Sequence, residues 1–194
     1  MDNFSPAVRK QVETRLAGIR QNPESASANG RLGMVLHAHN QFGSAAVCYR
    51  RASLLDSESF RWAYYLGLVQ AAEGNHDEAA ATFDQALELN PDYLAARLQM
   101  AESLLAAGKT DESGEIFERI VKEHPTSSAA HFGWGRVLSR RRDFPLAAES
   151  YRKAIQLFPA YGASHYQLAL AYRNLEDNEK AERHMALYEE HKMG

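Results

Sequence analysis

The chain has 194 residues, of which 45% are hydrophobic and 24% charged, so its composition is that of a folded protein and not of a disordered one. Its 31 alanines outnumber the 15 valines, isoleucines and threonines together, which favours helices and leaves little material for a β-sheet. A single cysteine excludes an internal disulfide and a cysteine-based zinc cluster, and a net charge of −3 gives no basis for binding nucleic acid. A compact helical domain and a helical repeat array both remain.

The first predicted element is a helix over residues 6–21, because Ser5 is a favourable N-cap and Pro6 fits the first turn of a helix. No apolar run reaches the roughly 18 residues that a membrane span needs. Residues 1–11 lack the apolar core of a signal peptide. We therefore expect no direct membrane insertion and a cytoplasmic location, with a periplasmic location open if a signal peptide was removed.

Prolines mark a constant period along the chain. Pro91, Pro125 and Pro159 are 34 residues apart, and Pro23 lies two such steps before Pro91. Because proline is tolerated just beyond a helix end and is disruptive inside a helix, this spacing predicts helix ends at regular intervals. Five units of this length follow one another without a gap, and they begin at Ala26, Phe60, Leu94, Ser128 and Gly162.

Residues at equal positions of these units, numbered 1 to 34, share their size. Position 8 is small in every unit, and holds Gly33, Gly67, Ala101, Gly135 and Ala169. Position 24 is large, and holds Tyr49, Phe83, Phe117, Tyr151 and Met185. Positions 20, 24 and 27 share one face of a helix, and positions 7, 8 and 11 share one face of an earlier helix. Each unit therefore predicts helix A, a tight turn and helix B, and neighbouring units must stack to bury both faces.

This pattern resembles the tetratricopeptide repeat (TPR) family. The unit that resembles it most carries Leu66, Gly67, Gly74, Ala79, Phe83, Ala86 and Pro91. The resemblance implies an all-α fold, a right-handed α-solenoid of stacked helix-turn-helix units (an α-α superhelix). It implies an N-terminal capping helix in residues 1–25 and five units at 26–59, 60–93, 94–127, 128–161 and 162–194. Two positions depart from the family: position 4 lacks the usual tryptophan, and position 15 lacks glycine at Asn40, Arg142 and Glu176.

In this family helix A lines a concave groove, and ligands usually contact positions 2, 5, 6, 9, 12 and 13. The resemblance implies a partner-binding surface here, for which we select Arg31, Arg61, Tyr64, Tyr65, Gln99, Phe132, Arg136, Arg140, Tyr166, Gln167 and Arg173. Over all these positions five arginines stand against one glutamate, so we expect a basic groove. The windows that hold helix B, positions 15 to 31, carry 11 positive and 18 negative residues, so we expect an acidic outer face.

Groups for catalysis or metal binding are weaker candidates. His131 and His165 both stand at position 4 of adjacent helices A, but no carboxylate or cysteine completes a ligand set beside them. The turn at Gly108-Lys109-Thr110 lacks the earlier glycine and the preceding strand of a phosphate-binding loop. Cys48 is expected to be a small buried side chain. We therefore predict no catalytic residue, no metal and no cofactor.

These observations predict a non-catalytic scaffold that holds a peptide or a partner helix, with acidic segments, in its groove. Arginine and aromatic side chains are the usual anchors of protein interfaces. Two alternatives stay open. The array could self-associate into a homo-oligomer, or it could be the regulatory TPR segment of a larger enzyme or membrane-associated protein.

Overall fold

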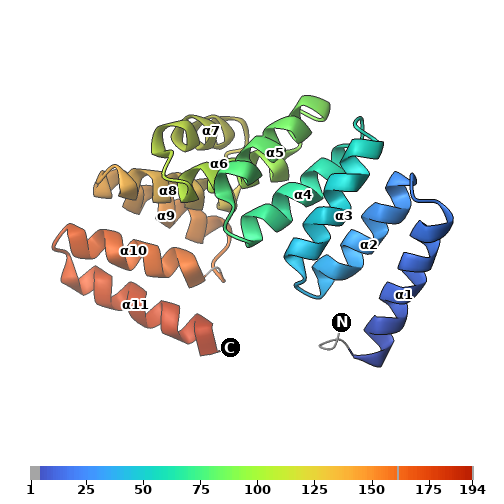
Figure 1. Cartoon of the computed structure of the whole chain (residues 1–194). Coiled ribbons are helices and arrows are strands. Elements are labelled where there is room, and N and C mark those ends of the chain that lie inside the picture. Colours follow the sequence, from blue (N-terminus) through green and yellow to red (C-terminus); the bar gives the residue numbers. More distant parts are fainter. Residues whose placement is uncertain (1–4, 161, 194) are drawn as a thin grey trace. The chain divides into compact units, whose positions relative to one another are not determined.

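The computed structural model describes residues 5–160 and 162–193, and they form α-helices without a β-strand (Figure 1). The helices are α1 Pro6–Gln21, α2 Ala26–Ala38, α3 Phe42–Leu55, α4 Phe60–Ala72, α5 His76–Leu89, α6 Leu94–Ala106, α7 Thr110–Glu123, α8 Ser128–Arg140, α9 Phe144–Leu157, α10 Gly162–Asn174 and α11 Asn178–Met193. The all-α prediction is confirmed. None of the helices described is both long and apolar enough to cross a membrane.

Helix starts recur at the spacing that the prolines indicate. The even-numbered helices from α2 to α10 begin at residues 26, 60, 94, 128 and 162, and each is followed by a second helix sixteen residues later. Pro23, Pro91, Pro125 and Pro159 lie in the turns that precede them. The prolines thus mark the connections between helical hairpins. We propose that α1 is a capping helix and that the five hairpins are the five repeat units.

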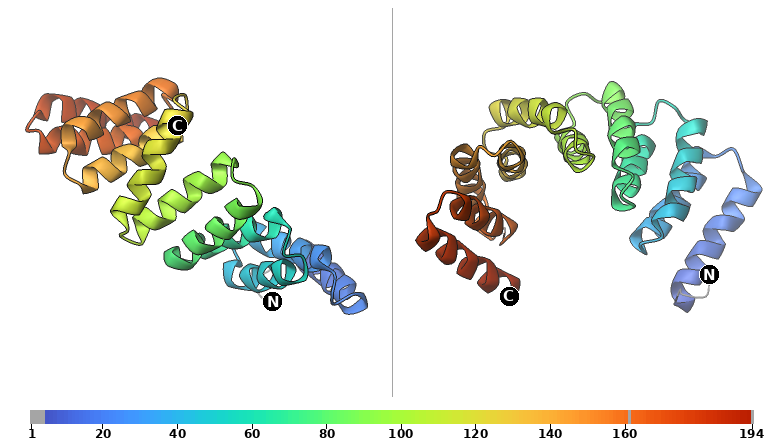
Figure 2. Two further views of the ribbon diagram at one scale, coloured as in Figure 1. Left: turned by 90° about the horizontal axis from the view of Figure 1, so that it is seen from above. Right: turned by 60° about the vertical axis from the view of Figure 1, so that its left-hand side comes forward.

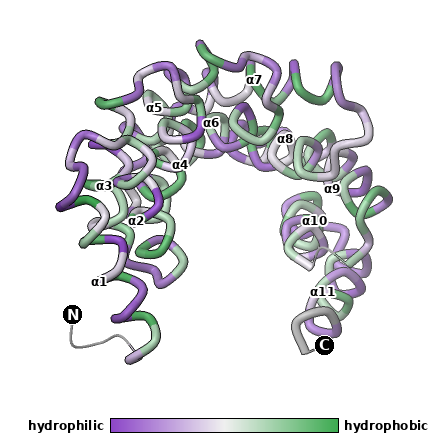
Figure 3. Tube along the Cα trace, turned by 90° about the vertical axis from the view of Figure 1, so that its right-hand side faces the viewer, coloured by the Kyte–Doolittle hydropathy of each residue, from purple (hydrophilic) through white to green (hydrophobic). Residues whose placement is uncertain are grey.

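The chain divides into two compact units, residues 1–103 and residues 104–194. Unit 1 contains α1 to α5 and most of α6, and unit 2 contains the end of α6 and α7 to α11. Figure 2 gives two further views of the hairpins within each unit. Hydrophobic and hydrophilic residues are interspersed along the helices (Figure 3), as in helices that bury one face.

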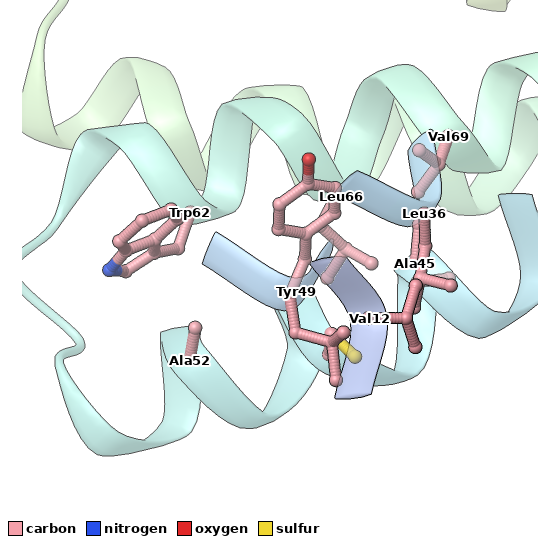
Figure 4. Packing of buried hydrophobic residues seen from close by; sticks show 11 residues of the cluster. Val12, Leu36, Ala45, Tyr49, Ala52, Trp62, Leu66 and Val69 are labelled. Carbon is pink, nitrogen blue, oxygen red and sulfur yellow. The ribbon is translucent and has the colours of Figure 1, made fainter. Parts of the chain in front are cut away.

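The core of unit 1 joins α1 to the hairpins that follow it. Val12, on α1, is buried among side chains of α2, α3 and α4 (Figure 4). The ring of Tyr49 stacks on that of Tyr65, with centroids 5.5 Å apart. Trp62 and Val69 of α4 complete this cluster. Through Val12, α1 therefore packs against the hydrophobic core of the hairpins that follow it.

Position 8 is small because the ring at position 24 occupies the space beside it. A Cβ atom added at Gly67 would lie 2.7 Å from the ring of Phe83. The same arrangement places Tyr49 against Gly33 in unit 1 and Tyr151 against Gly135 in unit 2. In these three hairpins a glycine at position 8 makes room for the aromatic ring at position 24, which explains the pairing of sizes in the sequence.

The turn from helix A to helix B has one conformation at all five sites. Position 15 has a positive φ, whether it is glycine, as at Gly74 (83°), or not, as at Arg142 (64°) and Glu176 (60°). The next backbone N–H donates to the carbonyl of position 11, as from Asn75 to Gln70 at 2.9 Å. This is the six-to-one hydrogen bond that ends many helices with a left-handed residue. Position 15 therefore keeps its geometry in units that lack the usual glycine.

Candidate functional site

A basic cleft opens in unit 1 among α1, α2 and α4, with a volume of about 460 Å³. Its lining contains Arg15 from α1, Arg31 from α2 and Arg61 from α4. The lining also contains Met34, which is 42% exposed, and the largely buried Trp62. No aspartate or glutamate lines the cleft in the described structure. It therefore offers positive charge beside apolar surface, which suits an acidic segment with hydrophobic side chains.

Gly30 on α2 allows the ring of Trp62 to pack closely against it, and this contact brings Arg31 and Arg61 to the same cleft. Trp62 is only 5% exposed, and its ring lies directly against Gly30, where an added Cβ would collide with it. Arg31 follows Gly30, and Arg61 precedes Trp62, so this contact sets both arginines at the same cleft. The guanidinium carbon of Arg61 lies 5.7 Å from the centroid of the Trp62 ring. Arg31 and Arg61 are both exposed to solvent.

The basic surface continues along α1. A neighbouring hollow of about 550 Å³ shares Gln11, Arg15 and Val35 with the cleft and adds Lys10. Lys10 and Arg15 were not predicted as site residues because α1 precedes the 34-residue numbering. The signal that could have found them is the run of basic residues on a helix expected to cover the first hairpin.

Tyr64 and Tyr65, which were predicted for the partner-binding surface, pack against other aromatic rings. Tyr64 is half-buried, and its ring lies 5.5 Å from Phe60 and 5.3 Å from Tyr93. Burial raises the pKa of the Tyr64 phenol. Tyr65 is half-buried and stacks on Tyr49. Gln99, on α6, is also half-buried. These three side chains lie in unit 1, but none of them lines the basic cleft.

The remaining predicted residues lie in unit 2, on α8 and α10. The guanidinium carbon of Arg136 lies 5.9 Å from the ring centroid of Phe132, and Phe132 in turn packs on Tyr151. Tyr166 is 38% exposed, with its ring 5.2 Å from that of Tyr188. Gln167 is half-buried, whereas Arg140 and Arg173 are exposed. Unit 2 therefore presents exposed cations and partly covered aromatic rings.

The histidines at position 4 take separate partners. The Nε2 atom of His131 lies 3.0 Å from the carbonyl oxygen of Pro125, while the Nδ1 atom of His165 lies 3.0 Å from Nδ1 of His184. No cluster of three or more histidine, cysteine or acidic side chains suited to a metal occurs among the described residues. Cys48 is buried, and this burial raises the pKa of its thiol.

Arg141, which directly follows α8, links this helix to α7. Arg141 donates to the carboxylate of Asp111 on α7 at 2.9 Å, and its guanidinium carbon lies 5.8 Å from the Trp134 ring centroid. This arginine therefore ties α7 to α8, a contact that proximity to a helix end does not predict. Arg140, its predicted neighbour in the binding surface, stays exposed.

Stacked helical hairpins with a fixed 34-residue spacing define a class of repeat scaffold. Two models of the tetratricopeptide repeat match the chain, one at residues 70–131 and the other at residues 31–93 and 132–190. The chain belongs to the tetratricopeptide repeat family. The predicted resemblance is confirmed.

Solved structures share this fold at low sequence identity. MamA (residues 41 to the end) from Desulfovibrio magneticus RS-1 is 18% identical, with a TM-score of 0.77 over 87% of this chain and 95% of that one. YrrB, described as a TPR protein with an unusual peptide-binding site, is 20% identical, with a TM-score of 0.70 over 93% of each chain. The predicted class, an α-solenoid of helix-turn-helix units, is confirmed. A comparison with curated proteins gives no match.

Proposed function

We propose that this protein is a non-catalytic scaffold that binds an acidic segment of a partner protein. The observation that carries the proposal is the cleft in unit 1, where Arg15, Arg31 and Arg61 line the same cleft as the exposed Met34 without a carboxylate in the described lining. Charge of one sign steers a partner of the opposite sign, and arginine forks can hold carboxylates with two hydrogen bonds. YrrB, which shares the fold, is described as peptide-binding, and this supports a peptide as the ligand.

Unit 2 supplies a second contact region in this proposal. Arg136, Arg140 and Arg173 provide cations, and Phe132 and Tyr166 provide apolar surface. Gln99, on α6, and Gln167, on α10, are each proposed to offer hydrogen bonds to a segment bound to its own unit.

The test is a fluorescence anisotropy titration of the full chain with a labelled peptide of alternating glutamate and leucine. We expect saturable binding that weakens steeply as salt rises from 50 to 500 mM, because exposed charges are screened. The double variant Arg31→Glu with Arg61→Glu should bind about tenfold more weakly or worse. The variant Arg136→Glu with Arg140→Glu measures how much unit 2 contributes to the affinity for the peptide.

A matched control separates the cleft from the net charge. Arg20→Glu with Arg51→Glu changes the total charge by the same amount at exposed arginines outside the cleft. The control should keep most of the affinity. Equal losses in the control and in the Arg31 and Arg61 variant would show non-specific attraction and would overturn the proposed site.

A further inference from the structure

A second cleft in unit 1, of about 660 Å³, lies between α3 and α5 and over α4. Its lining includes Ser53 and Leu54 of α3, Gln70 of α4 and Glu78 of α5. Arg61, which lines the basic cleft, stands nine residues before Gln70, about half a turn away around α4. The two clefts therefore use different sides of the same helix and share no lining residue.

Unit 2 contains a cleft of the same construction, about 670 Å³ in volume, between α7 and α9 and over α8. Residues that line the two clefts correspond at a distance of 68 residues, which is two repeat lengths: Ser53 and Val121, Leu66 and Trp134, Gln70 and Leu138, Glu78 and Leu146. The two clefts thus lie at equivalent positions of the repeat, but different side chains line them.

Three of these pairs exchange a polar side chain in unit 1 for an apolar one in unit 2. They are Ser53 with Val121, Gln70 with Leu138 and Glu78 with Leu146. Gln70 stands at position 11 of its 34-residue repeat, and the other four repeats carry leucine or tyrosine at that position. The fold therefore accepts apolar side chains at these positions, and the polar ones in unit 1 need a separate explanation.

Two polar atoms of the unit 1 cleft lack partners in the described structure. Gln70 is only 5% exposed, and its Nε2 donates to a carboxylate oxygen of Glu78 at 3.3 Å, but its Oε1 has no hydrogen-bond partner. The buried Oγ of Ser53 has none either. A buried polar atom without a partner is costly to a fold. Polar groups of this kind, gathered at one cleft, are typical of a surface that hydrogen-bonds a ligand.

Gln70 Oε1 accepts hydrogen bonds and the Ser53 hydroxyl can accept or donate one, and the charge around them is negative on balance. Glu78 and Glu88 line the cleft against a single cation, Arg50. Leu54, at 73% exposure, and Leu89, at 43%, add exposed apolar surface. We propose that this cleft binds a partner segment that carries a lysine or arginine between hydrophobic residues. The cation donates to Gln70 Oε1 and Ser53 Oγ and pairs with Glu78, and its apolar neighbours pack on Leu54 and Leu89.

The first test uses nuclear magnetic resonance of the ¹⁵N-labelled full chain. The probe is the peptide acetyl-Leu-Lys-Leu-amide, with the glutamate and norleucine peptides of the same length for comparison. We expect saturable shifts at the side-chain amide of Gln70 and at the backbone amide of Ser53 with the lysine peptide. Absence of saturable shifts, or equal shifts with the norleucine peptide, would overturn the proposal and leave a cleft that holds water or any apolar chain.

The second test converts the cleft to the chemistry of its copy. The variant Ser53→Val with Gln70→Leu should fold with an unchanged or higher Tm and bind the lysine peptide at least tenfold more weakly. Gln21→Leu, the same exchange at an exposed glutamine outside the cleft, should bind as the wild type does. Full binding by the double variant would contradict the proposal. Glu88→Lys, at an exposed residue, should also weaken binding and does not depend on core packing.

Discussion

The Nδ1 atoms of His165 and His184 lie 3.0 Å apart and join α10 to α11. One imidazole must donate and the other accept, so the bond holds a single proton between the two rings. His165 is buried, and the ring of Tyr172 stacks on His184 with centroids 5.7 Å apart. The Nζ atom of Lys180 lies over the ring of Tyr172, 5.3 Å from its centroid. This contact makes the last hairpin sensitive to protonation.

We expect the free energy of unfolding to fall as the pH drops below about 6.5. Burial, the neighbouring His165 and the charge of Arg183 lower the pKa of His184 below its ordinary value of 6.5. The folded state therefore binds fewer protons than the unfolded chain between these two values. The stability that neutral His184 contributes is fully present above pH 6.5, and it is lost as the pH falls through the lowered pKa of His184. Urea unfolding between pH 8 and pH 5.5 measures it.

The control for this prediction is His184→Phe, which keeps an aromatic ring and removes the titrating group. Its stability should depend less on pH than that of the wild type. Some dependence will persist, because burial also lowers the pKa of His37 in unit 1. Identical pH profiles for the variant and the wild type would show that the pair does not link protonation to folding.

Two tyrosines at position 24 should respond in opposite ways to loss of the hydroxyl. The hydroxyl of Tyr49 is buried without a hydrogen-bond partner in the described structure, whereas that of Tyr151 lies 3.0 Å from Ser139 Oγ. Phe83 shows that the position accepts phenylalanine. We expect Tyr49→Phe to raise the free energy of unfolding by up to about 1 kcal/mol and Tyr151→Phe to lower it by about 1 kcal/mol. Urea titrations compare them, and a clear loss for Tyr49→Phe would contradict this account.

Arg142→Gly should stabilise the protein by about 1 kcal/mol, because Arg142 has a φ of 64° in a region that disfavours side chains. Gly74 and Gly108 already provide glycine at the same position of other turns. Arg142→Ala is the matched control, since it removes the charge but keeps the Cβ atom and should bring no gain. Equal thermal midpoints for the glycine and alanine variants would rule out backbone strain as the cause.

Cys48 should react slowly with a thiol reagent in the folded protein. Its side chain is buried, and burial raises the pKa of the thiol, so little reactive thiolate is present near neutral pH. We expect labelling at pH 8 to be roughly a hundredfold slower than in the chain unfolded by guanidinium. Labelling at the rate of a free thiol such as glutathione would contradict the buried placement.

The helix register follows from the sequence because small and large side chains recur at equal positions of the 34-residue repeats. A glycine beneath a ring, as with Gly67 and Phe83, leaves a size pattern that recurs every 34 residues. The prolines between hairpins give the same phase. Arg31 and Arg61 could be selected as neighbours because their positions follow from this register, and both line one cleft.

Other features depend on how individual side chains fill space, and no single-sequence pattern records that. Tyr64 stands at an expected binding position, but its long side chain reaches Phe60 and Tyr93 and is half-buried there. Arg15 joins the cleft from a helix outside the repeat numbering. The contact of His165 with His184 was not predicted because His165 was compared with His131, which shares position 4 of the repeat. Gln70 did carry a signal, since it replaces leucine or tyrosine at position 11.

The ring-and-glycine contacts also bear on how the chain folds. Gly33 meets Tyr49, Gly67 meets Phe83 and Gly135 meets Tyr151, and each pair is only sixteen residues apart. Contacts of such short sequence separation cost little loop entropy to form, so each hairpin is expected to close quickly and before long-range order develops.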